Sequence, residues 1–293
     1  AIFIYGMNLM SDGLQKAAGE KMKDILALLT KNPVVGVLAG ALTTAVLQSS
    51  SATTVMTIGF VSAGLMTLKQ AVSVIMGANI GTTITAQLIA FQVGDYAWGF
   101  VIVGFVMFFF FANKKEKVGQ IGQVLFGFGL LFTGINVMGN TMTPLADAPV
   151  FEQLMLAVRD IPALGVVIGA GMTVAVQSSA ATIAVLQNLA AQTGSDGISS
   201  IIGLTGALPI LFGDNIGTTI TALLASIGTS VNARRAALAH TMFNLFGTLI
   251  FIWFIPQFAH VVALISPGGS ETAVIARQIA NAHLIFNILN TLI

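Results

Sequence analysis

The chain has 293 residues, of which 56% are hydrophobic and only 8% are charged, and its formal net charge is +1. A soluble domain carries roughly 25% charged residues, so this composition excludes a water-soluble protein and predicts an integral membrane protein. The small net charge gives no electrostatic basis for nucleic-acid binding, and the lack of cysteine excludes disulfides and Cys-ligated metal sites. Long apolar runs such as residues 98–112 favour an all-α protein over a barrel.

The first apolar segments are too short to cross a membrane singly. Residues 1–10 predict the end of a membrane helix, and the charged residues 11–32 predict an interfacial connector. Segments 34–48 and 52–65 would each be roughly 20 Å long as helices, whereas the hydrocarbon core is roughly 30 Å thick. Together they predict a re-entrant helical hairpin over residues 34–65. Two tilted spans joined by a polar turn are the alternative.

The next segment, residues 69–90, predicts a transmembrane helix that is discontinuous. Its centre contains the run Gly77–Gly81, and each glycine weakens a helix by roughly 1 kcal/mol relative to alanine. Residues 96–112 and 118–140 predict two further crossings, joined by a charged loop.

The same plan then starts again. A second hairpin over residues 163–192 and a second broken helix over residues 198–227 are followed by a return crossing at 236–255. The sequence therefore predicts three parts: a first inverted repeat at 1–112, a second inverted repeat at 113–255, and an additional C-terminal transmembrane helix within 256–293.

Two polar motifs recur in the two halves. The first is Gln48–Thr53, with its copy Gln177–Thr182, and the second is Gly77–Thr83, with its copy Gly213–Thr219. Self-similarity at this length predicts duplicated structural units that share a site. The second motif and the five residues that follow it differ between the copies at only two positions, Ala78/Asp214 and Gln87/Leu223.

The distribution of basic residues predicts opposite orientations for the two halves. If the first connector lies in the cytoplasm, all Lys and Arg residues fall inside except Arg159 and Arg277. This strong positive-inside bias makes the first hairpin enter from inside and the second from outside, which gives inverted-topology repeats.

The paired serine motifs predict an anion site near the membrane midplane. Serine is a favoured N-cap residue, and a helix N-terminus offers free N–H groups and a positive dipole end. Hydroxyls and amides suit a tetrahedral oxyanion with many acceptor atoms. The predicted substrate-binding residues are Gln48, Ser49, Ser50, Gln177, Ser178, Ser179, Asn79 and Asn215.

The motifs contain no Lys or Arg, so a buried anion needs co-bound cations to offset its charge. Hydroxyl and carboxylate oxygens are suitable ligands for Na⁺, and an intramembrane carboxylate such as Asp214 is a functional-site hypothesis by default. The predicted sodium ligands are Ser51, Thr53, Thr83, Thr182, Asp214 and Thr219.

Purely structural roles compete with these assignments. Ser, Thr and Gly pack at helix contacts in membranes, and the paired threonines can bond back to their own helices. Asn79 and Asn215 can be polar contacts between helices. His240 and His283 favour interhelical hydrogen bonds over ligand roles.

At these motifs the sequence resembles the type II sodium/phosphate cotransporters. The Gln-Ser-Ser motifs, the Gly-x-Asn-Ile-Gly-Thr-Thr motifs and the opening stretch Gly6–Leu14 are similar to those of bacterial members, which resemble solute carrier family 34. The resemblance covers residues 3 to about 255 and implies sodium-coupled phosphate uptake, with the Gln-Ser-Ser residues at the phosphate. Ala180 departs from the pattern, because the first copy has Ser51 there.

The resemblance also implies a setting for the protein. We expect a multi-pass protein of the inner (plasma) membrane that is not an enzyme, with Na⁺ as coupling ion and no organic cofactor. Its expected partners are inorganic phosphate, sodium ions and the lipid bilayer, and not nucleic acid. A homodimer remains open, as does a PhoU-like regulatory domain, which is absent from this chain.

Three classes of function are consistent with the sequence. The preferred class is a sodium-coupled phosphate symporter that works by alternating access. The alternative is an anion channel or exporter for phosphate or a similar oxyanion without sodium coupling, and Asp214 favours the symporter over it. A non-transporting receptor or scaffold is disfavoured by the inverted repeat.

Overall fold

The part of the chain that the structure describes consists of helices joined by turns and loops, with an isolated β-bridge between Thr193 and Ser200. The all-α prediction is therefore confirmed. By length and composition, four stretches of the described residues can cross a membrane: 68–90, 116–141, 203–225 and 231–264. The computed structural model describes residues 1–18, 32–91, 96–111, 116–146, 149–194 and 196–293.

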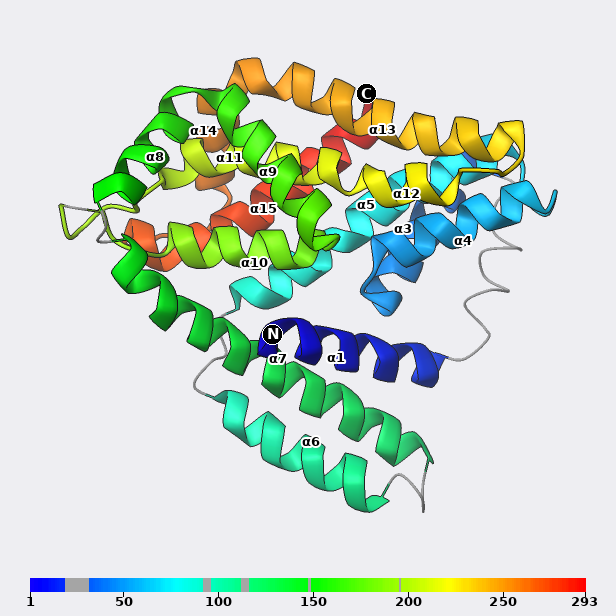
Figure 1. Ribbon diagram of the computed structural model, residues 1–293, viewed down its shortest axis with the longest axis horizontal. Helices are drawn as coiled ribbons and strands as arrows, with labels where there is room; N and C mark the ends of the chain where they lie inside the picture. The colour runs from blue at the N-terminus through cyan, green and yellow to red at the C-terminus, as the bar shows by residue number, and fades with distance from the viewer. Residues whose placement is uncertain (19–31, 92–95, 112–115, 147–148, 195) are drawn as a thin grey trace.

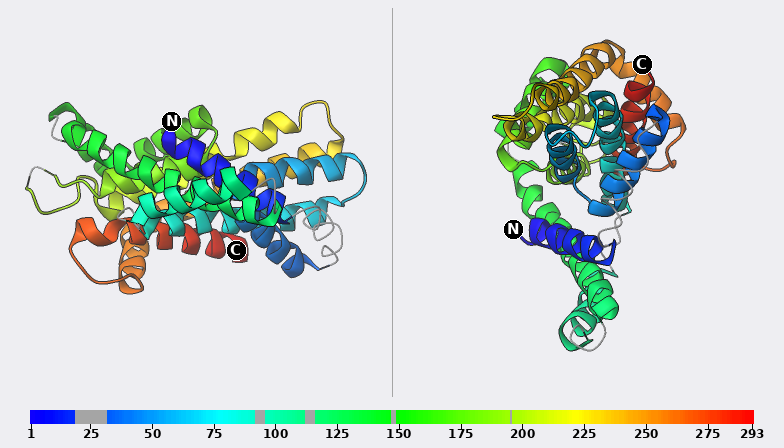
Figure 2. Two further views of the ribbon diagram at one scale, coloured as in Figure 1. Left: turned by 90° about the horizontal axis from the view of Figure 1, so that it is seen from below. Right: turned by 90° about the vertical axis from the view of Figure 1, so that its right-hand side faces the viewer.

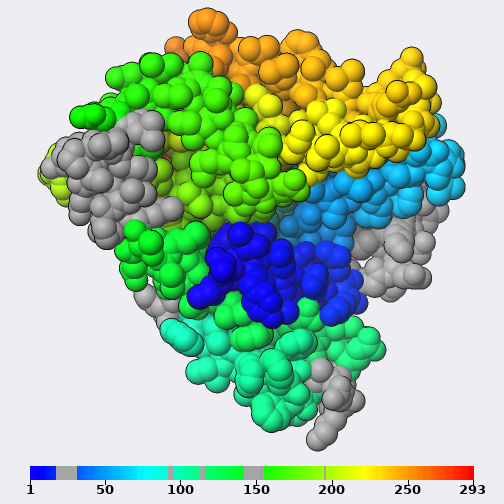
Figure 3. Space-filling view, in the orientation of Figure 1, coloured from blue at the N-terminus to red at the C-terminus, as the bar shows by residue number. Residues whose placement is uncertain are grey.

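Three helices form an arm that projects from the rest of the molecule (Figures 1 and 2). They are α1 (Ile2–Ala18), α6 (Ala97–Phe111) and α7 (Glu116–Ala146), and α7 packs against both of the others. In the space-filling view, α1 lies on the surface between the α6–α7 pair and the remaining helices (Figure 3). α1 is thus the helix of the arm that lies next to the remaining helices.

Each serine motif forms a sharp turn between two short helices. α3 (Pro33–Leu47) leads into α4 (Ser50–Ser62), and α9 (Pro162–Val176) leads into α10 (Ser179–Ala190). Gln48 and Gln177 adopt the left-handed conformation, with φ of 53° and 55°. Among the described residues they are the only non-glycine residues with positive φ. A left-handed C-cap ends a helix and reverses the chain, so both turns have the same local cause.

α5 (Leu68–Ala90) is an unbroken helix, so the predicted discontinuity at Gly77–Gly81 is wrong. These glycines serve helix packing instead. A Cβ on Gly77 would lie 1.9 Å from the carbonyl oxygen of Val37 in α3, and a Cβ on Gly40 would lie 2.0 Å from that of Val74. Small residues spaced four apart let two membrane helices approach backbone to backbone, and this contact outweighs the low helix propensity of glycine.

The equivalent helix in the second half is interrupted within the repeated motif, as predicted. α11 (Gly203–Gly217) ends at the second glycine of the motif, and α12 (Thr219–Ala225) begins after Thr218. Residues 198–202, which were predicted to start this helix, precede it as turns and bends. Gly169 of α9 and Gly213 of α11 repeat the close backbone contact of the first half. α8 (Pro149–Asp160) packs on the same two helices.

The C-terminal part contains more helices than the single span predicted after residue 255. α13 (Val231–Phe251) passes through the short 3₁₀ helix η2 (Ile252–Phe254) into α14 (Ile255–Leu264). α15 (Glu271–Leu292) then packs against both α5 and α11, so it joins the two halves.

One of the two differences between residues 77–88 and 213–224 anchors α5 to α15. Gln87 donates to the side-chain oxygen of Asn281 at 3.0 Å and accepts from Arg277 at 2.7 Å. The Arg277 guanidinium also lies 3.9 Å from the ring centroid of Phe91. Leu223, at the position of Gln87 in the second copy, instead packs against an apolar cluster.

Several predictions fall on residues outside the described ranges. Residues 19–31 of the predicted connector lie outside them, whereas residues 11–18 continue α1. The lysines at 21, 23, 31, 114 and 115, which entered the charge argument, also lie outside them, as does Asp95, which the inverted topology places on the outer side. The orientation of the chain in the membrane therefore stays a prediction.

Candidate functional site

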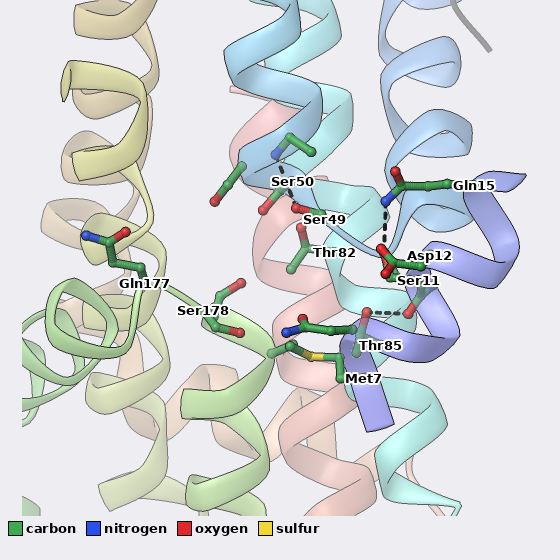
Figure 4. A pocket seen from close by; sticks show the side chains of 16 residues that line it. Met7, Ser11, Asp12, Gln15, Ser49, Ser50, Thr82, Thr85, Gln177 and Ser178 are labelled. Atoms are coloured by element: carbon green, nitrogen blue, oxygen red, sulfur yellow. Dashed lines mark hydrogen bonds between the residues drawn. The ribbon is translucent and has the colours of Figure 1, made fainter. Parts of the chain in front are cut away.

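The two serine turns, far apart in sequence, line one common cavity of about 270 Å³ (Figure 4). Ser49 and Ser50 lie on one side, and Ser178 lies across from them. Six of the eight predicted substrate residues are therefore brought together, namely Gln48, Ser49, Ser50, Gln177, Ser178 and Ser179, along with Ser51.

Capping leaves hydrogen-bond donors free at both turns. The Ser49 hydroxyl oxygen accepts from the N–H of Ala52 at 3.1 Å, and that of Ser178 accepts from Ala181 at 3.2 Å. The N–H groups at the first two positions of α4 and of α10 have no hydrogen-bond partner in the described chain. Two helix N-termini thus present N–H groups and hydroxyls to the same cavity, which is the arrangement that binds an anion.

The two glutamines differ in their surroundings. The Gln48 side-chain oxygen accepts from the Thr85 hydroxyl at 2.8 Å, and its nitrogen donates to the carbonyl of Ala45. Gln177 is exposed, and its side chain makes no hydrogen bond among the described residues. Gln48 therefore fixes its turn against α5, while the amide of Gln177 keeps its hydrogen-bonding capacity.

Helix α1 supplies a wall of the cavity that the sequence argument missed. The Ser11 hydroxyl donates to the carbonyl of Leu47 at 2.6 Å, which ties α1 to the end of α3, and Gln15 donates to Ser11 at 3.0 Å. The opening stretch Gly6–Leu14 was matched to the family pattern but was given no role in the site. From α1 the lining residues are Met7, Asn8, Ser11, Asp12 and Gln15, and from α5 they are Thr82 and Thr85.

Asn79 and Asn215 do not line the cavity. The side-chain oxygen of Asn79 lies 3.2 Å from Nε2 of His240 on α13, and Asn215 donates to the carbonyl of Leu211 in its own helix at 2.9 Å. Both side chains are buried. These contacts favour the alternative in which the two asparagines are polar contacts within the helix bundle.

A buried polar cluster lies behind the second serine turn. The Thr173 hydroxyl lies 2.6 Å from Oδ1 of Asp214 and 3.0 Å from the hydroxyl of Thr182. Asp214 is fully buried, and its Oδ2 has no hydrogen-bond partner among the described residues. Thr173 was not predicted, although its position four residues before Gln177 repeats that of Thr44 before Gln48.

The first half has only part of this cluster. The hydroxyl of Thr44 lies 2.9 Å from that of Thr53, but Ala78 stands at the repeat position of Asp214. The second half alone therefore combines two hydroxyls with a carboxylate oxygen that lacks a partner.

The remaining predicted sodium ligands have other contacts. Thr83 donates to the carbonyl of Ile80 in its own helix at 2.7 Å, and Thr219, the first residue of α12, donates to the carbonyl of Ile216 near the end of α11 at 2.8 Å. Ser51 accepts from Thr221 of α12 at 3.3 Å, which links the first turn to the second half.

Comparison with known proteins gives matches along most of the chain. The family described as Na⁺/Pi-cotransporter matches twice, over residues 2–140 and over residues 141–285. The chain is 32% identical over 269 residues to the uncharacterized protein YqeW of Bacillus subtilis, covering 92% of this chain and 84% of that protein. No solved structure matches.

Two further relatives have names that state a function. A protein of Escherichia coli with the provisional name inorganic phosphate export protein YjbB is 27% identical over 275 residues, which cover 94% of this chain. The chain spans about half of that relative, 49% of its length. The sodium-dependent phosphate transport protein 2A of Ovis aries is 37% identical over 97 residues, 32% of this chain and 15% of that protein.

Proposed function

The chain belongs to the Na⁺/Pi-cotransporter family, and we propose that it is a sodium-coupled symporter of inorganic phosphate in the inner (plasma) membrane. The observation that carries this proposal is the pair of serine turns, one from each copy of the motif, facing one cavity. Phosphate offers four oxygens with many lone pairs, and the two turns offer hydroxyls and free N–H groups.

The charge of the cavity supports sodium coupling. No Lys or Arg is among the described residues that line it, so none of these residues offers a fixed cation to neutralise a bound phosphate. Burying an anion without compensation is costly, and a co-bound cation offsets that cost. Binding of phosphate would then depend on sodium, which is the thermodynamic basis of symport.

We assign one sodium ion to the cluster of Thr173, Thr182 and Asp214. The unpartnered Oδ2 of Asp214 supports this assignment, because a buried carboxylate oxygen without a hydrogen bond is destabilising unless a cation or a proton neutralises it. Hydroxyl and carboxylate oxygens are hard ligands that suit an alkali cation. Thr182 connects this cluster to the serine turn through the carbonyl of Ser178, 3.3 Å from its hydroxyl.

The two helix pairs would enter the membrane from opposite faces as re-entrant hairpins. Their helices have 12 to 15 residues, which is roughly 20 Å, short of the roughly 30 Å hydrocarbon core. A site between inverted repeats is suited to alternating access. The repeat boundaries predicted from the sequence are retained in this proposal.

The second candidate is export or passive conduction of phosphate without sodium. It draws support from YjbB, the relative named as an inorganic phosphate export protein. Uptake of labelled phosphate into proteoliposomes separates the two candidates when it is measured with an inward sodium gradient, with equal sodium and with potassium alone. Accumulation against the phosphate gradient only under the sodium gradient is expected. Equal fluxes in all three conditions would exclude sodium coupling.

A further inference from the structure

Among the residues that the structure describes, Asp12 is the only ionisable side chain that lines the cavity of the serine turns. It lies on α1, next to Ser11, which ties that helix to the end of α3 (Figure 4). The Asp12 side chain is exposed and has no hydrogen bond or ion pair among the described residues. A carboxylate in a cavity built for an anion repels that anion, so its presence needs a physical explanation.

The hydrogen-bond donors and acceptors that line the cavity explain the presence of Asp12. The serine turns contribute hydroxyls and free N–H groups, which can all donate. The side-chain oxygen of Gln48 already accepts from Thr85 at 2.8 Å. An ionised carboxylate only accepts hydrogen bonds, so Asp12 is the one charged acceptor among the described lining residues, beside hydroxyl, amide and N–H groups that can donate.

Phosphate and sulfate differ in whether they can donate a hydrogen bond. Both are tetrahedral oxyanions of similar size, but phosphate near neutral pH carries at least one proton and sulfate carries none. Phosphate is therefore both donor and acceptor, whereas sulfate can only accept. An O–H···O⁻ hydrogen bond to a carboxylate is short and stronger than a neutral one, while an unprotonated oxygen at the same place meets like charge.

We propose that Asp12 is a specificity-determining residue that accepts a hydrogen bond from the P–OH group of bound phosphate and thereby excludes sulfate. This inference rests on the proposed function, since it requires phosphate in the cavity. Specificity of this kind comes from a repulsive element against the competitor as much as from attraction to the substrate. Arsenate is also protonated near neutral pH, so it could donate the same hydrogen bond to Asp12 and would not be excluded.

The experiment compares the parent protein with Asp12→Asn in proteoliposomes at pH 7. Uptake of labelled phosphate is measured against increasing sulfate, and equilibrium binding of both anions to purified protein is measured in parallel. The parent is expected to be insensitive to a large excess of sulfate. In Asp12→Asn the ratio of sulfate to phosphate inhibition constants should fall at least about tenfold, because the amide can donate to sulfate.

Two variants serve as controls. Asp160→Asn removes an exposed carboxylate that does not line the cavity and should keep the selectivity of the parent. Asp12→Glu keeps the charge and should still exclude sulfate if it transports. If Asp12→Asn does not transport, the binding measurement alone decides, and it must show the fall in selectivity.

Two results would overturn the inference while leaving the proposed function intact. One is an Asp12→Asn variant that binds phosphate and still excludes sulfate. The other is a variant in which only the sodium concentration for half-maximal uptake changes, which would make Asp12 a cation ligand. A parent protein that neither binds nor transports phosphate would instead overturn the proposed function and this inference together.

Discussion

Thr173→Val tests the proposed sodium site by removing one hydroxyl with little change in shape. A hydroxyl has one proton to donate, and the shortest of the Thr173 contacts is that of 2.6 Å to Oδ1 of Asp214. The substitution therefore removes a hydrogen bond to a carboxylate and a hydroxyl oxygen that could bind sodium. A hydrogen bond to a charged group contributes about 1.5–3 kcal/mol, which corresponds to roughly 10- to 100-fold in affinity.

The first half of the chain provides a matched control. Thr44 occupies the repeat position of Thr173 and lies 2.9 Å from the Thr53 hydroxyl, but no carboxylate is near because Ala78 replaces the aspartate. Thr44→Val loses one neutral hydrogen bond, which contributes about 1 kcal/mol. This loss corresponds to at most about a fivefold change in sodium affinity.

The assay is the sodium dependence of labelled phosphate uptake in proteoliposomes, with thermal unfolding of each purified variant to verify folding. Half-maximal uptake is expected to require about tenfold more sodium or higher in Thr173→Val, and nearly unchanged sodium in Thr44→Val. Equal shifts in the two variants, or none in Thr173→Val with normal transport, would refute the sodium site at Asp214.

Three further predictions concern the site and the topology. Ser50→Ala or Ser179→Ala should each weaken phosphate binding about tenfold, since a lost polar partner costs about 1–3 kcal/mol; parent-like affinity in both would make the serine turns packing elements. Asp214→Asn should weaken sodium activation and keep phosphate binding at high sodium, whereas a changed pH dependence with unchanged sodium activation would indicate proton coupling. Single cysteines at Lys117 and Arg234 should react only with reagents added from the cytoplasmic side, and outside labelling at either would contradict the inverted topology.

The serine turns were predictable from sequence because two signals coincide there. Polar residues interrupt apolar segments at Gln48 and Gln177, and the same interruption occurs twice. The cause of each turn, a left-handed glutamine followed by a serine N-cap, is local, so it can be inferred without knowledge of the tertiary structure.

The parts that failed depend on contacts between distant segments. Gly77 predicts a helix break when only its own segment is considered. Its contact with the α3 backbone, which stabilises the helix there, cannot be predicted from the sequence. Asp12 and Thr173 stand outside the repeated motifs, and only the packing of α1 and α11 brings them to the cavity and to Asp214. Asn79 does not line the cavity, because a repeated motif does not say which face of its helix meets the cavity.

The glycine contacts have a mechanical consequence. At Gly40 and Gly77, and again at Gly169 and Gly213, two backbones touch with no side chain between them. Side chains can change rotamer to accommodate sliding, whereas apposed backbones cannot. The helix before each serine turn is therefore rigidly packed on the next long helix, α3 on α5 and α9 on α11. We expect each of these pairs to move as one rigid body. Any motion that exposes the serine turns to one side of the membrane must therefore change contacts other than these glycine contacts.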